Sequence, residues 1–234
     1  MKKLKQLYEG KAKKLFETED QDLVIQEFKD DATAFDATKR GTIMNKGVIN
    51  NKLSEKLFTL LEKKGVPTHF VKLLNDRDML VKKVQIVPIE VTMRNIVAGG
   101  MSRLLGLEEG IVLKEPVLEY HYKEDKLHDP LINDYHIRAL NIASDKELET
   151  IAKYSFKVND EMKEFFDSKN LILVDFKLEF GRYKGKIILA DEISPDTCRL
   201  WDKTTKEKLD KDRFRRDLGN VEEAYQEVLR RVIG

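Results

Sequence analysis

A lysine lies between two carboxylates in the segment LILVDFKLEFG, at residues 171–181. Asp175, Lys177 and Glu179 occupy every second position, and the alternate positions are apolar: Val174, Phe176, Leu178 and Phe180. A period of two is typical of a strand with one polar and one apolar face. Most such polar faces are simply solvated. Carboxylates beside a lysine could instead bind a divalent cation and a phosphate, and oxygen ligands suit Mg²⁺.

The chain is expected to fold back directly after this strand. Gly181 and Gly185 favour a turn, so residues 186–190 are predicted to form the second strand of a hairpin. Asp191 and Glu192 end that strand. The hairpin would therefore gather further carboxylates around the single lysine of the polar face.

The run SPDTCRLWD, at residues 194–202, is predicted to be a turn that carries binding residues. Asp196 and Arg199 are not needed for turning, and loops held on rigid strands are where binding residues concentrate. Cys198 is the one cysteine of the chain, and without a nearby histidine it is assigned no catalytic role. A single cysteine excludes an intrachain disulfide and fits a reducing cytosol, so a cytoplasmic location is expected.

The composition favours an enzyme with small-molecule substrates. Lys and Arg total 43 against 42 Asp and Glu, which gives a net charge of +1. Such a balance provides no global field for nucleic acid or an anionic membrane, and neither is expected as a partner. Hydrophobic residues make up 41% of the chain, which is enough for a core. No apolar run approaches the roughly 20 residues that span a bilayer.

Hydrophobic periodicity predicts strands early in the chain and longer helices later. The predicted elements are a strand meander over residues 4–30, a helix over 46–64, strands over 67–70, 79–84 and 87–93, the hairpin, and helices over 145–169 and 219–233. Loop and helix are expected between Ala98 and the 145–169 helix, which should begin at a capping box of Ser144 and Glu147.

This order of elements predicts an α+β protein with two lobes. A smaller, antiparallel β-rich N-terminal lobe would span residues 1–84, and a larger α/β lobe would span residues 85–234. The four histidines lack metal-ligand spacing, so no zinc site is predicted.

A glycine and two lysines in the first predicted hairpin could hold a phosphate. They belong to the turn formed by Gly10, Lys11, Ala12 and Lys13. Glycine lets backbone N–H groups approach a phosphate and lysines supply charge, although a bare surface hairpin would look the same. The Walker pattern is absent, so this is not a P-loop NTPase. Together with the carboxylates, the turn resembles a β-flap that covers nucleotide phosphates.

From end to end, the chain resembles the phosphoribosylaminoimidazole-succinocarboxamide synthase (SAICAR synthetase) family. The motifs that carry this resemblance are LYEGKAK (7–13), VKK, VPIEVTMRN and AGG (within 81–100), HDPLI (128–132), LVDFKLEFG (173–181), DEISPDTCRLWD (191–202) and LDKDRFRRDLG (209–219). The resemblance implies a two-lobed SAICAR-synthase-like fold with ATP between the lobes. It implies a Mg-ATP-dependent ligase that joins carboxyaminoimidazole ribonucleotide (CAIR) to L-aspartate through an acyl phosphate. A homodimer is also expected.

The resemblance also implies roles for individual residues. The expected ATP-binding residues are Gly10, Lys11, Ala12, Lys13, Lys82, Lys83, Val84 and Lys123. The expected metal ligands are Glu179 and Asp191. The expected catalytic residues are Lys177, Asp175, Arg94 and Arg199. The expected substrate-binding residues are Arg94, Gly100, Ser102, Asp129, Asp175, Asp196, Arg199 and Arg215.

Two regions match the family less closely. Lys123, His128 and Asp129 belong to a loop that is mobile in the family, and the aspartate pocket is located only by Asp36 and Lys39. Many members carry Ser where this chain has Gly100, so the hydroxyl of Ser102 is expected to share that contact with the ribotide.

Two other functions would use the same residues. A small-molecule kinase would share the flap and the metal but would release a phosphorylated product without aspartate. A nucleotide-binding regulatory protein would keep the flap and could dispense with the carboxylate–lysine cluster, which this chain retains.

Overall fold

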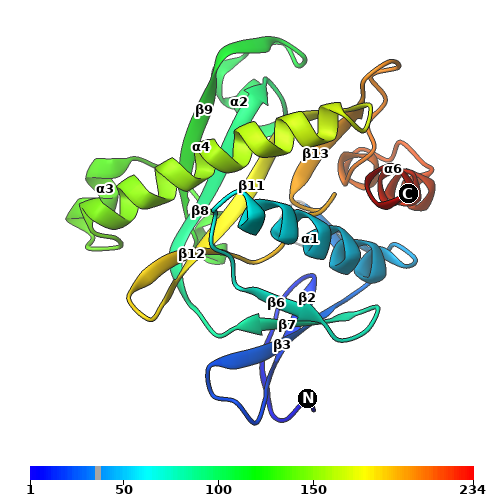
Figure 1. Cartoon of the computed structure of the whole chain (residues 1–234). Helices are drawn as coiled ribbons and strands as arrows, with labels where there is room; N and C mark the ends of the chain where they lie inside the picture. Colours follow the sequence, from blue (N-terminus) through cyan, green and yellow to red (C-terminus); the bar gives the residue numbers. More distant parts are fainter. Residues whose placement is uncertain (35–37) are drawn as a thin grey trace.

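Two antiparallel sheets form the framework of the computed structural model, which describes residues 1–34 and 38–234 (Figure 1). The first sheet has the strand order β1-β2-β3-β7-β6. Its strands are β1 (Gln6–Glu9), β2 (Lys13–Glu17), β3 (Leu23–Phe28), β6 (Phe70–Leu73) and β7 (Asp78–Lys82). A separate ribbon pairs β4 (Asp31–Ala34) with β5 (Lys39–Thr42). The predicted N-terminal meander is confirmed.

The second sheet has the order β10-β9-β8-β11-β12, and β13 also pairs with β11. Its strands are β8 (Gln85–Ile96), β9 (Val112–Tyr122), β10 (Leu131–Ile132), β11 (Leu171–Tyr183), β12 (Lys186–Ala190) and β13 (Cys198–Asp202). The predicted hairpin is confirmed as β11 and β12. Its turn residues Lys184 and Gly185 have φ values of 47° and 76°, and positive φ at both central residues is what a type I′ turn requires.

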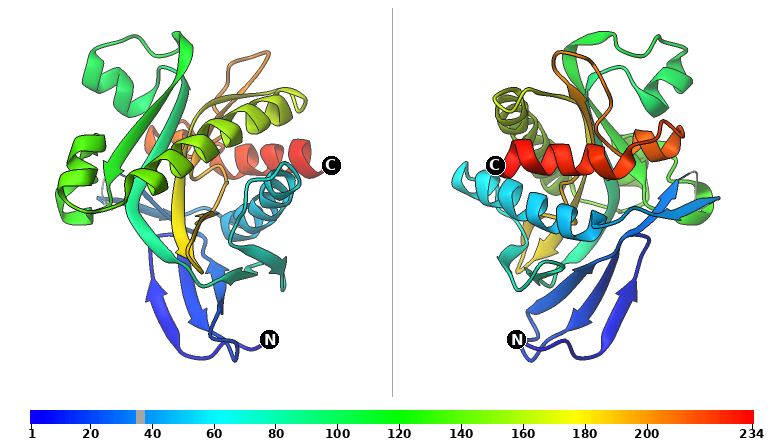
Figure 2. Two further views of the ribbon diagram at one scale, coloured as in Figure 1. Left: turned by 60° about the vertical axis from the view of Figure 1, so that its left-hand side comes forward. Right: turned by 90° about the vertical axis from the view of Figure 1, so that its right-hand side faces the viewer.

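Helices cover one face of the second sheet, and the long helix at Asp145–Asp167 makes most of their contacts with it. The helices are α1 (Lys46–Lys63), α2 (Gly99–Leu105), α3 (Asp134–Ala139), α4 (Asp145–Asp167), α5 (Asp212–Arg215) and α6 (Val221–Ile233). In the views of Figures 1 and 2, α4 crosses β8 and β11 while α1 and α6 lie beside each other below it. The three helices predicted from periodicity are confirmed. None of the described helices has the length and apolarity needed to span a membrane.

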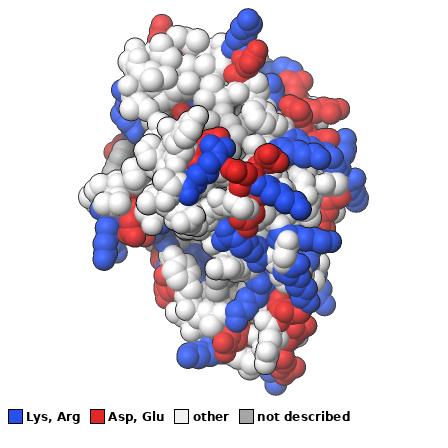
Figure 3. Space-filling view, turned by 90° about the vertical axis from the view of Figure 1, so that its left-hand side faces the viewer, with Lys and Arg blue, Asp and Glu red and all other residues white. Residues whose placement is uncertain are grey.

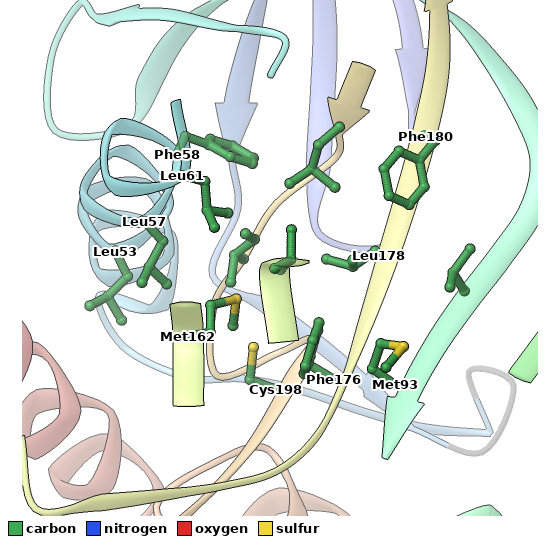
Figure 4. Packing of buried hydrophobic residues seen from close by; sticks show 14 of the residues in the cluster. Leu53, Leu57, Phe58, Leu61, Met93, Met162, Phe176, Leu178, Phe180 and Cys198 are labelled. Atoms are coloured by element: carbon green, nitrogen blue, oxygen red, sulfur yellow. The ribbon is translucent and has the colours of Figure 1, made fainter. Parts of the chain in front are cut away.

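The apolar side of β11 packs against these helices. Phe176, Leu178 and Phe180 point toward Leu57 of α1 and Met162 of α4 (Figure 4). Because successive side chains of a strand alternate between its faces, the charged residues of β11 must project from the opposite side. The helices therefore bury one face and leave the other to build a site.

One position of the predicted alternation is wrong. Val174 lies with Ile172 in a separate apolar cluster, because the pairing of β11 with β13 shifts register between Leu173 and Asp175. Such a bulge moves the residues before it to the other face. The continuous apolar face of β11 therefore begins at Phe176.

Strands β9 and β13 were also missed, as were the short strands β4, β5 and β10. The predicted turn at residues 194–202 ends early, and Cys198–Asp202 form β13, in which Cys198 and Leu200 enter the core. Charged neighbours masked this alternation. The region expected to be loop and helix contains β9, whose outer edge is paired by β10 only near Tyr120. Pro116 lies on the unpaired part of that edge, where proline is tolerated.

The predicted lobe boundary at residue 84 coincides with a change of sheet. The first sheet ends at Lys82 and the second begins at Gln85. One hydrophobic cluster nevertheless includes Val24 of the first sheet, Leu57 of α1 and Phe180 of the second. The division into lobes at this residue stays a prediction.

The capping box that begins α4 is confirmed, and it predicts a specific acid sensitivity. The Ser144 N–H donates to Glu147 Oε2 at 2.9 Å, and Arg182 donates to the same oxygen at 3.2 Å. The hydrogen bond from Arg182 lowers the pKa of Glu147 from 4.5 to about 2. A lowered folded-state pKa contributes stability above pH 4.5 that is lost as pH falls toward 2.

We expect Glu147→Gln to cost about 1 kcal/mol at pH 7, because the pair is partly solvated. The loss should shrink as pH falls from 4.5 to 2, as measured by urea unfolding at each pH. Glu149→Gln, at an exposed position of the same helix, is the control. A difference between wild type and Glu147→Gln that does not change with pH would contradict the prediction.

Candidate active site

A cavity of about 1600 Å³ lies between the two sheets. Most of the predicted site residues line it: Gly10, Lys11, Ala12, Lys13, Lys82, Lys83, Val84, Arg94, Gly100, Lys123, Asp129, Asp175, Lys177, Glu179, Asp191, Asp196, Arg199 and Arg215. Ser102, His128 and Lys39 are not among the lining residues, and Asp36 lies outside the described residues. The chain thus brings the flap, the carboxylates and the arginines to one cleft.

Lys177 is held at the middle of the polar face of β11. Its Nζ lies 3.0 Å from Glu90 Oε2 and 3.3 Å from Glu179 Oε1. Burial would lower the pKa of Lys177, but Glu179 and Glu90 outweigh it and raise that pKa well above its ordinary value. Lys177 is therefore a cation fixed between two carboxylates. The alternation of Glu90, Thr92 and Arg94 could have identified Glu90 as part of this face.

Glu179 and Asp191 lie together because β12 pairs Ala190 with Glu179. Lys123 forms an ion pair with Glu179, and Lys13 from the flap forms one with Asp191. Burial would raise the pKa of Asp191, but Lys13 is the main cause that holds it below its ordinary value. Asp191 is therefore ionised. Asp191 has a φ of 64°, a left-handed conformation that Asp and Asn adopt more readily than other side chains.

The donor set fits Mg²⁺ bound together with a nucleotide. Glu179 and Asp191 offer only oxygen atoms, and Mg²⁺ commonly takes one or two carboxylates plus phosphate oxygens. Among the described residues, no group of three or more His, Cys, Asp or Glu could hold a metal ion by itself. The lysines that now pair with these carboxylates would then be available to the phosphates.

Asp175 organises the arginines. It is only 3% exposed and accepts hydrogen bonds from Arg94 Nη1 at 2.6 Å and from Arg199 Nη1 at 2.8 Å. Pairing of β11 with β8 and β13 places both arginines directly opposite Asp175. Asp212 continues the network, because it accepts from Arg199 Nε at 2.9 Å and from Arg215 Nη1 at 2.6 Å.

A glycine allows this arrangement. Gly99 has a φ of 54°, and a Cβ there would lie 2.4 Å from Arg199 Nη2. Any side chain at this position would displace the guanidinium. Asp212 was missed in the sequence, although its spacing of three residues from Arg215 in a short helix is a recognisable pairing.

Asp196 is engaged by residues that the sequence did not suggest. Lys46 is fully buried and donates to Asp196 Oδ2 at 2.7 Å, and the Tyr225 hydroxyl donates to Asp196 Oδ1 at 2.6 Å. Lys211 lies 3.7 Å from the same carboxylate. Asp196 therefore joins α1, α6 and the cleft, and no local pattern links residues so far apart in the chain.

The segment between the sheets lies close to β11. A Cβ at Gly181 would lie 2.5 Å from Val84 Cγ2, so only glycine lets Val84 approach this strand. Lys82 Nζ donates to the Thr68 carbonyl at 2.8 Å. On the opposite rim, Lys11 of the flap lies 2.9 Å from Asp125. These contacts place the flap and the segment at residues 82–84 on two sides of one opening.

The fold and the site together are those of an enzyme whose cleft, between two sheets, is lined by charged residues suited to phosphorylated ligands. The model of the SAICAR synthetase family matches residues 6–232. The chain is 62% identical over 232 residues to phosphoribosylaminoimidazole-succinocarboxamide synthase of Caldanaerobacter subterraneus subsp. tengcongensis, covering 99% of each. It is 60% identical to that of Thermoanaerobacter sp. over the full length of both. The chain belongs to the SAICAR synthetase family, and the resemblance noted in its sequence is confirmed.

Solved structures of SAICAR synthetases have the same fold as this chain. The synthase from Ehrlichia chaffeensis superimposes with a TM-score of 0.96 at 46% identity, covering 97% of this chain and 98% of that one. A SAICAR synthetase in complex with ADP superimposes with a TM-score of 0.94 at 51% identity, covering 97% of each chain. The two-lobed SAICAR-synthase-like fold is thereby confirmed.

Proposed function

We infer that the chain is an ATP-dependent ligase that joins CAIR and L-aspartate to give SAICAR, ADP and phosphate in purine biosynthesis. Membership of the SAICAR synthetase family carries this inference. The cleft agrees with it, because a flap lysine, two carboxylates and Lys177 meet at one end and arginines meet at the other.

The reaction needs an activated carboxylate, because a carboxylate has no good leaving group. We propose that a carboxylate oxygen of CAIR attacks the γ-phosphorus of ATP, so that ADP leaves and an acyl phosphate forms. The aspartate nitrogen then attacks the carbonyl carbon, phosphate leaves, and the amine loses a proton as the amide forms. Positioning and charge neutralisation would supply most of the acceleration.

The residues divide between the two substrates. Gly10 to Lys13 and Lys123 would hold the ATP phosphates, and residues 82–84 would meet the adenine. Lys177 would stabilise the negative charge on the transferring phosphoryl group. Arg94, Arg199 and Arg215 would bind the ribotide phosphate and carboxylate, and Asp175 would orient the first two. Closure of the cleft would keep water from the acyl phosphate.

Glu179 and Asp191 would hold Mg²⁺, which when bound would neutralise charge between the ATP phosphates. We further propose a cytoplasmic, homodimeric enzyme, in line with the single cysteine and with the symmetric dimers common among enzymes of this size. Lys39 forms an ion pair with Asp217 and does not line the cleft. The location of the aspartate pocket therefore stays a prediction.

Release of ADP tests the proposal directly. Mg-ATP, CAIR and L-aspartate are supplied together and then with one substrate omitted at a time. Release that requires all three, with SAICAR formed, is expected. Release that persists without aspartate would indicate a kinase or an uncoupled phosphatase, and no release with any mixture would refute the assigned substrates.

Ser102 offers a sharper test of the ribotide site. Its hydroxyl donates to the Leu107 carbonyl at 2.7 Å, outside the cleft lining. The structure therefore does not bring Ser102 to the place that the sequence suggested, and we expect Ser102→Ala to leave the KM for CAIR unchanged. A rise in KM would restore the original prediction.

Gly100 is the matched position inside the cleft. A Cβ there would lie 3.5 Å from Arg94 Nη2, which is ordinary contact. Gly100→Ser would place a hydroxyl beside this arginine, and we expect it to lower the KM for CAIR about threefold, as one added hydrogen bond would. An unchanged or raised KM would mean that position 100 does not face the ribotide.

A further inference from the structure

His121 of β9 contacts two groups that can only accept hydrogen bonds. Its Nε2 lies 3.4 Å from Glu119 Oε2, and its Nδ1 lies 3.1 Å from the carbonyl oxygen of Asp129. The same Glu119 oxygen accepts from Arg94 Nε at 2.8 Å. Because a carboxylate and a carbonyl have no proton to give, both ring nitrogens must carry one for both contacts to be hydrogen bonds. The arrangement selects the imidazolium form.

The surroundings of the ring favour that cation. Glu90 lies opposite His121 on β8, and Leu131 opposite it on β10 is uncharged. Burial lowers the pKa of His121, but the hydrogen bonds to Glu119 and to the Asp129 carbonyl outweigh it and raise the pKa above 6.5. The charged groups that face the ring are Glu119 on its own strand, Glu90 and Arg94 from β8, and Asp129 from the loop.

We propose that His121 is a positioning residue, which fixes Arg94 through Glu119 and ties the loop at residues 123–130 to the same carboxylate. This inference rests on the proposed function, in which Arg94 binds the ribotide. A neutral imidazole has one N–H and can keep only one of the two contacts. Loss of the proton therefore releases either the loop or the support of Arg94.

The pH dependence has a definite sign. Because the folded-state pKa of His121 is raised above 6.5, both hydrogen bonds of the imidazolium form below pH 6.5. One of them is lost as pH rises through the raised pKa. The affinity for the ribotide should therefore decline on the alkaline side. None of this requires the imidazole to touch a substrate, which distinguishes His121 from the arginines.

The link itself can be tested in the ligand-free protein, independently of catalysis. Heteronuclear NMR of the imidazole groups should show both nitrogens of His121 protonated as pH falls below 6.5, with a midpoint above 6.5. Glu119→Gln should move that midpoint down, while the exposed His136, which caps α3, should not move. A midpoint below 6.5, or one that Glu119→Gln leaves in place, would overturn the proposal.

Kinetics then test the positioning role. His121→Phe should raise the KM for CAIR at least about tenfold at pH 7, the effect of one hydrogen bond to a charged group, with kcat nearly unchanged. Between pH 7 and 9 the ribotide phosphate stays dianionic, so the KM of the wild type should rise toward that of the variant. A KM ratio that is independent of pH, or a fall in kcat alone, would refute the role.

The variant Arg94→Ala distinguishes the proposed role of Arg94 in ribotide binding from the contact between His121 and Glu119. An unchanged KM for CAIR in this variant would refute the proposed function of Arg94 and with it the positioning role of His121. The NMR link between His121 and Glu119 would still stand in that case, so a failure of the site assignment is distinguishable from a failure of the link.

Discussion

Replacement of Asp191 by Asn should reduce turnover at least about a hundredfold while leaving the fold intact. The change removes one charge from the pair of carboxylates that we propose for Mg²⁺. Asn keeps the shape of the side chain and tolerates the φ of 64° at this position. Lys13 would retain Glu192, which lies 3.1 Å from its Nζ, so the buried lysine would not be left without a partner.

Three measurements define this outcome. The kcat of the variant is compared with its thermal midpoint and with its Kd for Mg-ATP, which should weaken. Asp22→Asn is the control, because Asp22 also pairs with a lysine but lies outside the cleft lining. Retained turnover in Asp191→Asn would place the metal elsewhere.

Lys46→Met should destabilise the protein by about 3–5 kcal/mol. Lys46 is fully buried, and its removal leaves Asp196 with the hydroxyl of Tyr225 and a lysine, Lys211, 3.7 Å away. Burial would raise the pKa of Asp196, but Lys211 and Lys46 hold it below its ordinary value, so the carboxylate is charged when its partner is removed. A buried carboxylate that has lost its nearest cation accounts for the size of the loss.

The same helix provides the control. Lys52 forms an ion pair with Asp76 at 3.1 Å at the surface, and Lys52→Met should change the free energy of unfolding by less than about 0.5 kcal/mol. Adding Asp196→Asn to Lys46→Met should recover part of the loss, because it removes the buried charge that has lost its nearest cation. A loss below about 1 kcal/mol in Lys46→Met alone would mean that Lys211 replaces the missing partner.

The sequence predicted the parts of the site that lie on strongly patterned elements. The alternation in β11 placed Lys177 between its carboxylates, and the hairpin turn brought Asp191 beside Glu179. β13 was missed because its charged residues resemble a turn, although Arg199 owes its position opposite Asp175 to strand pairing.

The contacts of Asp196 could not be predicted from the sequence, for a different reason. Lys46 and Tyr225 are 150 and 29 residues away from it in the chain, and their meeting depends on how α1 and α6 pack. His121 and Glu119 were missed with β9, since a strand edge interrupted by Pro116 gives a weak periodic signal. Local patterns predicted the strands, whereas the partners supplied by packing had to be observed.

The ion pairs of the cleft have a consequence for how ATP enters it. Lys13, Lys123 and Lys177 each already hold a carboxylate, and charges of both signs are interspersed over the face drawn in Figure 3. A cleft balanced in this way projects little attraction over distance, so the rate of encounter with Mg-ATP should depend only weakly on ionic strength.

The same balance should protect the enzyme from simple anions. An inorganic phosphate ion would have to separate these lysines from their carboxylates and could offer the carboxylates nothing in return. Mg-ATP, as proposed above, would bring an anion for the lysines and a cation for the carboxylates at once. The nucleotide would thus bind by replacing the ion pairs between the lysines and the carboxylates. Inorganic phosphate alone would occupy little of the cleft, even in a cell rich in free phosphate.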